Sequence, residues 1–214
     1  MTHLFFDLDG TLTDSAEGIM RAYAYMMDAL SLPYGDYTDF RRVVGPPLFD
    51  CFPEDGVPRG KEEEALRLFQ SYYAERGIWE NRVYDGILKA LSRLREGGAR
   101  LYVVTSKPEH FAKRILERFG LSHYFEDIIG ADMAETLHKK EDLLREILKR
   151  NRITPSRDRA LIGDRSYDII GAHALGLTAV GVLWGIGDEE ELKVAGADLL
   201  LPSPASLDTL LRKE

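Results

Sequence analysis

The chain is poor in cysteine: Cys51 is the only one among 214 residues. A single cysteine cannot form an intramolecular disulfide, so the fold needs no oxidising compartment. Long apolar runs are lacking too, and none approaches the roughly 20 residues of a membrane-spanning helix. No basic stretch precedes the first apolar residues, which argues against a signal peptide. We therefore expect a cytoplasmic protein that does not enter a membrane.

A net positive charge is also missing. The sequence has 28 lysines and arginines against 36 aspartates and glutamates, which gives a net charge of −8. The resulting field disfavours nucleic acid polymers and anionic membranes as partners. A small anionic substrate is still compatible with it if local cations line the binding site. The length allows one sizeable domain with a smaller accessory domain.

Short β-rich stretches alternate with helical patterns over most of the chain. The expected strands cover residues 4–8, 100–104, 127–130, 159–163, 178–182 and 198–201, and the expected helices between them cover 86–96, 108–119, 140–150 and 166–175. Such alternation predicts parallel strands with helices on both faces of the sheet. The expected fold class is therefore α/β, with a Rossmann-like core.

Residues 15–82 break this alternation, because their pattern is almost entirely helical. Apolar residues recur at helical spacing over 15–30 and again over 61–76, with a Gly45-Pro46-Pro47 turn between the two. We predict a Rossmann-like core formed by residues 1–14 and 83–214. The α-helical domain at 15–82 would be inserted into it.

Polar side chains follow several of the expected strands at the point where each one ends. Asp7 and Asp9 follow the first strand, Thr105 follows the second, and Asp164 follows a later one. Ligands of open parallel sheets bind outside the carboxyl ends of the strands. A single aspartate at a strand end is usually a turn or helix cap. Several of them at one edge indicate a functional site.

Asp7 and Asp9 raise an electrostatic question. Two carboxylates about 4 Å apart repel by roughly 4 kcal/mol at an effective dielectric constant near 20. Together with Asp164 they offer the oxygen ligands that Mg²⁺ prefers, and Mg²⁺ takes one or two carboxylates beside a substrate phosphate. With the cation bound, Asp7 could attack phosphorus as a nucleophile. Asp9 could then act as general acid and afterwards as general base.

Candidate phosphate ligands follow the second and third expected strands. The Thr105 hydroxyl could donate to a phosphate oxygen. Ser106 has the position of a helix cap, with Pro108 in the first turn, and the free N–H groups of that helix would point at the same anion. Lys139 and Lys140 open another helix, where a cation is unfavourable unless an anion lies near. A solvated surface pair is the alternative for these lysines.

The run Asp7-Leu8-Asp9-Gly10-Thr11-Leu12-Thr13-Asp14-Ser15 resembles the DxDGTLxDS signature of the haloacid-dehalogenase superfamily, in its phosphoglycolate-phosphatase-like branch. The other motifs of that family have counterparts in the same order: residues 103–108, Lys140 with Asp142, and the GDxxxD run at 163–168. The resemblance covers nearly the whole chain.

This resemblance implies a nucleophile at Asp7 and a general acid/base at Asp9. It implies Mg²⁺ held by Asp7, the backbone carbonyl of Asp9, and Asp164, with Asp168 contributing behind them or through water. Thr105 and Lys140 would hold the phosphoryl group. Lys140 is preferred to Lys139 because residues 140–144 match the family's K-x-D-apolar-apolar run.

The resemblance also implies that the helical domain closes over the site as a cap, excludes water and selects the substrate. Candidate cap contacts are Arg41, Arg42 and Gly45, the last in a turn that resembles the family's specificity loop. A cap arginine could pair with a carboxylate or a second phosphate of the substrate. A solvated arginine on a helix face is the alternative for each of them.

The leading hypothesis is a Mg²⁺-dependent phosphatase that hydrolyses a small phosphorylated metabolite, such as phosphoglycolate or a nucleoside monophosphate. A phosphomutase of the β-phosphoglucomutase type is one alternative, although residues 15–82 show no clear match to mutase cap contacts. A non-catalytic phospho-ligand-binding module is another. A dehalogenase is disfavoured, because the resembling dehalogenases lack the second aspartate. The oligomeric state is left open between monomer and homodimer.

Overall fold

A parallel sheet forms the centre of the protein. The computed structural model describes residues 1–134 and 137–211. Six strands lie in the order β5–β4–β1–β6–β7–β8, and each neighbouring pair is parallel. Their bounds are β1 His3–Phe6, β4 Arg100–Pro108, β5 Phe125–Ala131, β6 Arg159–Gly163, β7 Thr178–Val182 and β8 Leu199–Leu201. The predicted α/β Rossmann-like fold is confirmed.

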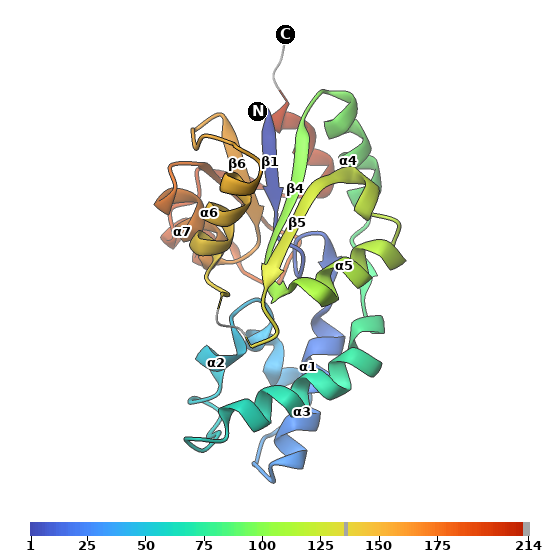
Figure 1. Ribbon diagram of the computed structural model, residues 1–214, viewed down its shortest axis with the longest axis vertical. Coiled ribbons are helices and arrows are strands. Elements are labelled where there is room, and N and C mark those ends of the chain that lie inside the picture. Colours follow the sequence, from blue (N-terminus) through green and yellow to red (C-terminus); the bar gives the residue numbers. More distant parts are fainter. Residues whose placement is uncertain (135–136, 212–214) are drawn as a thin grey trace.

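Helices cover both faces of this sheet (Figure 1). Successive side chains of a strand point to opposite faces, and in β1 Leu4 and Phe6 join one hydrophobic cluster whereas Phe5 joins the other. The first cluster includes the apolar faces of α4 (Ile87–Glu96) and α5 (Glu109–Arg118). The second includes those of α6 (Lys140–Arg150), α7 (Ser166–Ala174) and α8 (Glu189–Val194). Because both faces are buried, the strands read as apolar runs rather than as alternating patterns.

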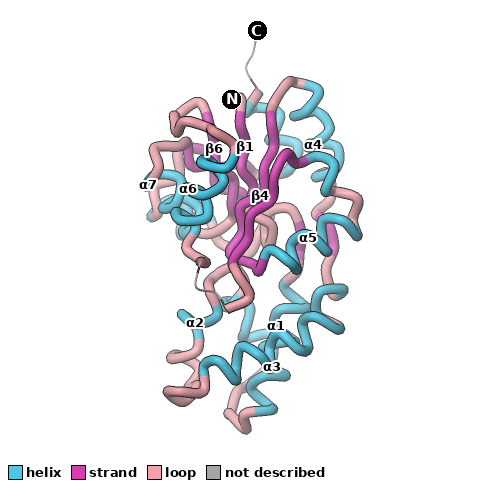
Figure 2. The backbone as a smooth tube through the Cα atoms, viewed as in Figure 1, coloured by secondary structure: helices cyan, strands magenta, loops and turns pink. Residues whose placement is uncertain are grey.

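The helices of residues 15–82 lie beyond the carboxyl ends of the strands, at the lower end of the molecule in Figure 2. They are α1 Ala16–Ala29, α2 Leu48–Cys51 and α3 Glu62–Glu75, with 3₁₀ turns at Tyr37–Val43 and Gly77–Trp79. We call residues 15–82 the helical segment. Its two connections to the sheet lie side by side, since β2 (Thr13–Asp14) pairs antiparallel with β3 (Arg82–Val83). The domain division at residues 14 and 83 stays a prediction.

The predicted cap role of Ser106 is wrong, although the helix begins only one residue after its expected start at 108. Strand β4 continues to Pro108, and α5 begins at Glu109. A residue that precedes proline is disfavoured in the helical conformation, so Lys107 stays extended and delays the helix. The Ser106 hydroxyl donates to the backbone carbonyl of His138 at 3.1 Å instead of capping a helix.

The last part of the chain completes the edge of the sheet. The predicted edge strand at 198–201 is present as β8, and the short C-terminal helix is a 3₁₀ helix, Pro204–Leu210. Helix α8, with six residues, was not expected, and the Asp188 side chain caps it by accepting from the Glu191 N–H at 2.7 Å. Among the residues that the structure describes, none of the helices has the length and apolarity to cross a membrane.

Candidate active site

Three carboxylates converge at the carboxyl edge of the sheet. Asp7 follows β1, Asp164 follows β6, and Asp168 lies in the first turn of α7. One oxygen from each lies within 4.8 Å of the others, and all three side chains are buried. The crossover topology brings these residues together, because β1 and β6 are neighbours in the sheet although about 155 positions separate Asp7 from Asp164 in the sequence.

A buried lysine lies between two of these carboxylates. The Lys140 ammonium is 2.9 Å from Asp7 Oδ1 and 2.8 Å from Asp168 Oδ1, and it donates to the backbone carbonyl of Val104 at 3.1 Å. Burial opposes its charge, but Asp168 and Asp7 outweigh that effect and raise the pKa of Lys140. The structure brings Lys140 to the site, whereas the neighbouring Lys139 is exposed.

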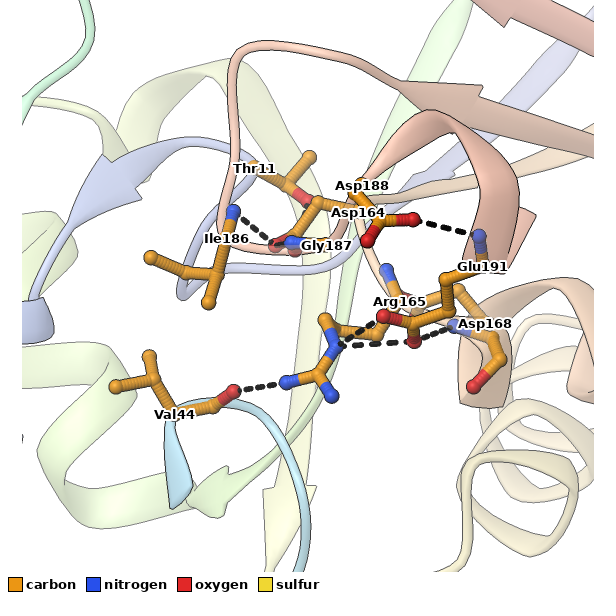
Figure 3. A network of polar contacts seen from close by, with 10 residues as sticks. Thr11, Val44, Asp164, Arg165, Asp168, Ile186, Gly187, Asp188 and Glu191 are labelled. Carbon is orange, nitrogen blue, oxygen red and sulfur yellow. Dashed lines mark hydrogen bonds and ion pairs between the residues drawn. The ribbon is translucent and has the colours of Figure 1, made fainter. Parts of the chain in front are cut away.

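Asp164 is held by backbone donors of a second loop (Figure 3). Its Oδ2 accepts from the N–H groups of Ile186 at 2.8 Å and Gly187 at 3.4 Å, and its Oδ1 accepts from the Thr11 hydroxyl at 3.2 Å. Burial, together with the charges of Asp168 and Asp7, nevertheless raises the pKa of Asp164 to about 7. These donors hold the Asp164 carboxylate in one orientation. Its negative charge is unfavourable there because of burial and the two neighbouring carboxylates.

Gly10 leaves the space that this arrangement needs. Its φ is +80°, and a Cβ at this position would lie 2.2 Å from Asp164 Oδ2. Gly185, in the loop after β7, is similarly constrained, because a Cβ there would lie 2.4 Å from the Asp164 Cβ. The sequence motif included Gly10, but we did not anticipate the loop at 185–187. Its two glycines around Ile186 were the available signal.

The donor set fits a hard divalent cation. Oxygen atoms of three carboxylates surround one point, which is the ligand type of Mg²⁺. Asp7 Oδ1 and Asp168 Oδ1 both contact the Lys140 ammonium, so one positive charge faces three buried carboxylates. Buried carboxylates in excess of their cationic partners are costly. Asp7, Asp164 and Asp168 could therefore hold a metal ion.

Asp9 does not point into this cluster but pairs with a different lysine. Its Oδ2 lies 2.8 Å from Lys107 Nζ, and that ammonium donates to the Tyr73 hydroxyl at 2.8 Å. Burial opposes the charge of Lys107, but the Asp9 and Tyr73 oxygens outweigh it and raise the pKa of Lys107. Burial also raises the pKa of Tyr73 to about 12, so its hydroxyl stays neutral.

Lys107 lies within the motif at residues 103–108, at the end of the second expected strand, but no role was predicted for it. It lies two residues after Thr105, and positions of that spacing in an extended strand share a face. No pattern in the sequence pointed to Tyr73, because only the folded chain brings α3 over the end of β4. The pairing of Lys107 with Asp9 and Tyr73 was therefore found from the structure.

A small cavity of about 50 Å³ lies over Asp7 and Asp9. Thr105 and Ser106 line it from the sheet, and the helical segment contributes Ile19, Val43, Gly45, Pro46, Pro47, Leu48 and Phe69. Gly45, predicted to contact the substrate, is thus among the residues that line this cavity. Neither predicted arginine lines this cavity: Arg42 pairs with Asp55, and Arg41 lines a different hollow, beside Asp14 and Arg82.

Arg165 connects the sheet to the helical segment. Its Nη1 donates to the backbone carbonyl of Val44 at 2.5 Å, and its Nε donates to Glu191 Oε1 at 3.0 Å (Figure 3). A Cβ on the next residue, Gly45, would lie 3.0 Å from the Arg165 Cγ. The turn that borders the cavity is thus held against the residue that follows Asp164.

Buried carboxylates and a buried lysine at the carboxyl edge of a parallel sheet define an α/β enzyme that handles an anionic group beside a cation. Residues 4–182 match the family described as haloacid dehalogenase-like hydrolase. The chain belongs to this family, which confirms the resemblance of its motifs.

Known relatives support this assignment. A 5'-nucleotidase of Pseudomonas aeruginosa is 36% identical over 192 residues, which cover 89% of this chain and 86% of the relative. The tyrosine-protein kinase PtkA of Mycobacterium tuberculosis is 39% identical over 184 residues, which cover 86% of this chain and 62% of the kinase. The crystal structure of a predicted phosphatase from Clostridium acetobutylicum superposes with a TM-score of 0.91 at 41% identity, covering 97% of this chain and 96% of the other. The chain is accordingly a member of the haloacid dehalogenase-like hydrolase family.

Proposed function

We propose that the enzyme is a Mg²⁺-dependent phosphatase that hydrolyses a small phosphomonoester through an aspartyl-phosphate intermediate on Asp7. The observation that carries this proposal is the carboxylate cluster. Oxygens of Asp7, Asp164 and Asp168 lie within 4.8 Å of one another, beside the Lys140 ammonium. A nucleophile, a cation site and a positive side chain thus meet at one point.

Asp7 and Asp164 would hold the metal ion, with the backbone carbonyl of Asp9 as a further ligand and Asp168 contributing directly or through water. When bound, Mg²⁺ supplies positive charge that neutralises the phosphoryl oxygens. Asp168 has a second task, since its contact with Lys140 at 2.8 Å keeps that ammonium turned toward Asp7. Preorganised charge of this kind is usually the largest contribution to catalysis.

The phosphoryl group would bind between Lys140 and Thr105, whose side chain is buried and lines the cavity. An Asp7 carboxylate oxygen attacks phosphorus, and the leaving oxygen takes a proton from Asp9. Asp9 then accepts a proton from a water molecule, and that water oxygen attacks phosphorus. The Asp7–phosphorus bond breaks, inorganic phosphate forms, and Asp7 is regenerated as a carboxylate. Ser106 borders the cavity and is left with a packing role, because its hydroxyl is bonded to His138.

The helical segment would act as a mobile cap. The cavity of about 50 Å³ is far below the roughly 300 Å³ at which small-molecule pockets begin. Substrate therefore needs the segment to move away before it can bind. Closure afterwards excludes water and strengthens the electrostatic interactions inside.

The substrate is a small phosphorylated metabolite, and the Gly45-Pro46-Pro47 turn is the best-placed contact for its leaving group. Nucleoside monophosphates come first because of the Pseudomonas aeruginosa relative, and phosphoglycolate comes next. The relative named as a kinase favours a second candidate, transfer of the phosphoryl group to an acceptor other than water. A phosphomutase would be one form of such transfer. The enzyme would work in the cytoplasm, as a monomer or a homodimer.

Substitution Asp7→Asn tests the proposal. The substitution removes the attacking oxygen but keeps the size of the side chain. Phosphate release from every active substrate should fall below about 1% of the wild-type rate, because loss of a nucleophile typically lowers the rate by more than about 100-fold. The measurement is a phosphate-release screen over phosphorylated metabolites with and without Mg²⁺. Asp85→Asn, at an exposed position, is the matched control. Retained turnover in Asp7→Asn, or activity without any divalent cation, would remove the proposed mechanism.

A further inference from the structure

A chain of buried polar contacts links the helical segment to Asp9. It runs from the Tyr73 hydroxyl on α3 to Lys107 Nζ at the end of β4, and from there to Asp9 Oδ2. Both contacts measure 2.8 Å. Lys107 thus contacts the proposed general acid directly, and Tyr73 contacts it through Lys107.

Tyr73 is fixed by its neighbours. Its ring stacks on Phe69 at 5.7 Å between centroids with an interplanar angle of 7°, and it meets Phe111 edge-on at 5.4 Å. Phe69 belongs to the helical segment and Phe111 to α5, so the ring is wedged between the two layers. The position of the Tyr73 hydroxyl therefore depends on the position of α3 relative to the sheet.

Lys107 is buried at a cost that its contacts must offset. Its side chain is 5% exposed, and its ammonium lies 4.3 Å from the centroid of the Tyr73 ring as well as beside the hydroxyl. Removing an ammonium and a carboxylate from water costs several kcal/mol for each ion, and well-packed apolar residues often replace such pairs without loss. The buried Lys107–Asp9 pair is therefore weak evidence for a gain in folding stability. It is better evidence that Lys107 orients the Asp9 side chain.

The second oxygen of Asp9, Oδ1, is the atom whose direction the Lys107 contact would fix. Asp9 Oδ1 is buried and accepts no hydrogen bond from any residue that the structure describes. Asp9 also lines the cavity. With Oδ2 held by Lys107, the carboxylate has one oxygen left for the substrate.

We propose that Lys107 and Tyr73 are positioning residues: Lys107 orients the Asp9 carboxylate toward the leaving-group oxygen, and Tyr73 makes this orientation depend on closure of the helical segment. This inference rests on the proposed role of Asp9 in phosphoryl transfer. When α3 moves away, Lys107 loses its hydroxyl partner and its ring contact, and Asp9 loses its fixed geometry. Proton delivery is thereby restricted to the closed enzyme.

The dependence of the rate on the leaving group separates positioning from mere packing. An alkyl phosphate, such as a nucleoside monophosphate, needs a proton on its leaving oxygen, whereas p-nitrophenyl phosphate releases a stable phenolate that does not. A variant with a misplaced Asp9 should lose kcat/KM on the first substrate and keep it on the second, because kcat/KM reports transfer to Asp7 and not the later attack of water, in which Asp9 serves both substrates alike. A variant with a generally damaged site loses both alike.

The test is to measure kcat/KM of Lys107→Met and Tyr73→Phe on both substrates. General acid catalysis contributes roughly 10²-fold or more, so Lys107→Met should lose about tenfold or more on the alkyl phosphate and less than about threefold on p-nitrophenyl phosphate. Tyr73→Phe, which keeps the ring, should show a smaller loss in kcat/KM, and this loss should again be larger on the alkyl phosphate than on p-nitrophenyl phosphate. Lys113→Met and Tyr72→Phe, at neighbouring positions outside the site, are the matched controls and should change neither rate.

Equal losses on both substrates, or no loss in either variant, would overturn the inference. Thermal unfolding and circular dichroism show whether Lys107→Met folds. If it does not fold, the rates of Tyr73→Phe on the two substrates test the inference instead. Asp9→Asn separates this inference from the proposed function. If Asp9→Asn shows the leaving-group bias and the two variants do not, only the positioning role fails. If Asp9→Asn lacks the bias, the role of Asp9 as a general acid fails and the inference with it.

Discussion

Asp7 and Asp9 lie two residues apart, yet each is paired with a lysine of its own. Lys140 lies 2.9 Å from Asp7, and Lys107 lies 2.8 Å from Asp9. The repulsion between the two carboxylates is thus already relieved by ammonium groups. It is therefore no argument for a metal ion by itself. The argument for a metal comes from Asp164 and Asp168, which add two more carboxylates to the same site.

Asp164 makes the stability of the metal-free protein depend on pH. Its pKa is about 7 in the folded protein and about 3.9 in an unfolded chain. Because the folded pKa is the higher one, the folded state binds the proton more tightly. This contribution to stability is complete below about pH 4 and is lost as the pH rises through 7. The loss amounts to at most roughly 4 kcal/mol, from about three pKa units at 1.36 kcal/mol each.

Asp164→Asn should therefore be more stable than the wild type at pH 8 in the presence of a chelator, and the difference should shrink toward pH 4. An asparagine can still accept from the Ile186 N–H, and its amide can donate to the Thr11 hydroxyl oxygen. Urea unfolding over a pH series measures the difference, with Asp85→Asn as the control. Added Mg²⁺ should stabilise the wild type at pH 8 and leave Asp164→Asn unchanged. A variant less stable than the wild type at pH 8 would refute this account of Asp164.

At the scale of elements, Arg165 is the link between the start of α7 and the turn before α2. Its guanidinium donates to Val44 and Glu191, and its side chain is 16% exposed. A hydrogen bond from a charged group is worth about 1.5–3 kcal/mol. Loss of the Val44 contact should shift the helical segment toward its open position.

Arg165→Met should consequently lower kcat/KM by about tenfold, the equivalent of about 1.4 kcal/mol, and speed the proteolysis of residues 15–82. Steady-state kinetics and limited proteolysis measure the two effects. Arg145→Met, at an exposed arginine of α6, is the control. Unchanged kinetics together with an unchanged cleavage rate would show that Arg165 does not hold the segment closed.

The elements of the sheet could be predicted from local sequence because their signals are local. An apolar run marks β6, and a run rich in β-branched residues marks β7, after the glycine break at Gly176 that ends α7. The cap at Ser106 was assigned wrongly because the capping pattern there competed with the effect of Pro108 on Lys107, and the proline prevailed. Helix α8 escaped notice because six residues cannot establish a helical period.

The site could be predicted only in part, for a physical reason. Asp7, Thr105, Lys140 and Asp164 lie at strand or helix ends, and a parallel sheet brings such ends together whatever the loops do. The contacts of Tyr73, Arg165 and Gly185 depend on how the helical segment and the loops pack, which no local pattern encodes. Arg41 and Arg42 were proposed on charge, but Arg42 pairs with Asp55 and Arg41 lines a hollow beside Asp14 and Arg82.

The whole molecule is acidic, and at its site two lysines face four carboxylates. Its net charge is −8, yet two fully ion-paired lysines, Lys107 and Lys140, lie at the edge of the sheet where the anion would bind. The helical segment covers this edge, and its two connections lie together at the β2–β3 ribbon (Figure 1). Movement at that ribbon would open the site without disturbing the sheet that carries the carboxylates.

In the proposed mechanism, the phosphoryl group is transferred to Asp7 before water receives it. The most direct measurement mixes the enzyme with Mg²⁺ and its best substrate for milliseconds, quenches the reaction, and reduces the protein with borohydride, which converts an aspartyl phosphate to homoserine. Peptide mass spectrometry then locates the reduced residue. We predict homoserine at position 7 in the wild type and none in Asp7→Asn. Reduction at another residue, or phosphate release with no reduced residue at position 7, would contradict the claim.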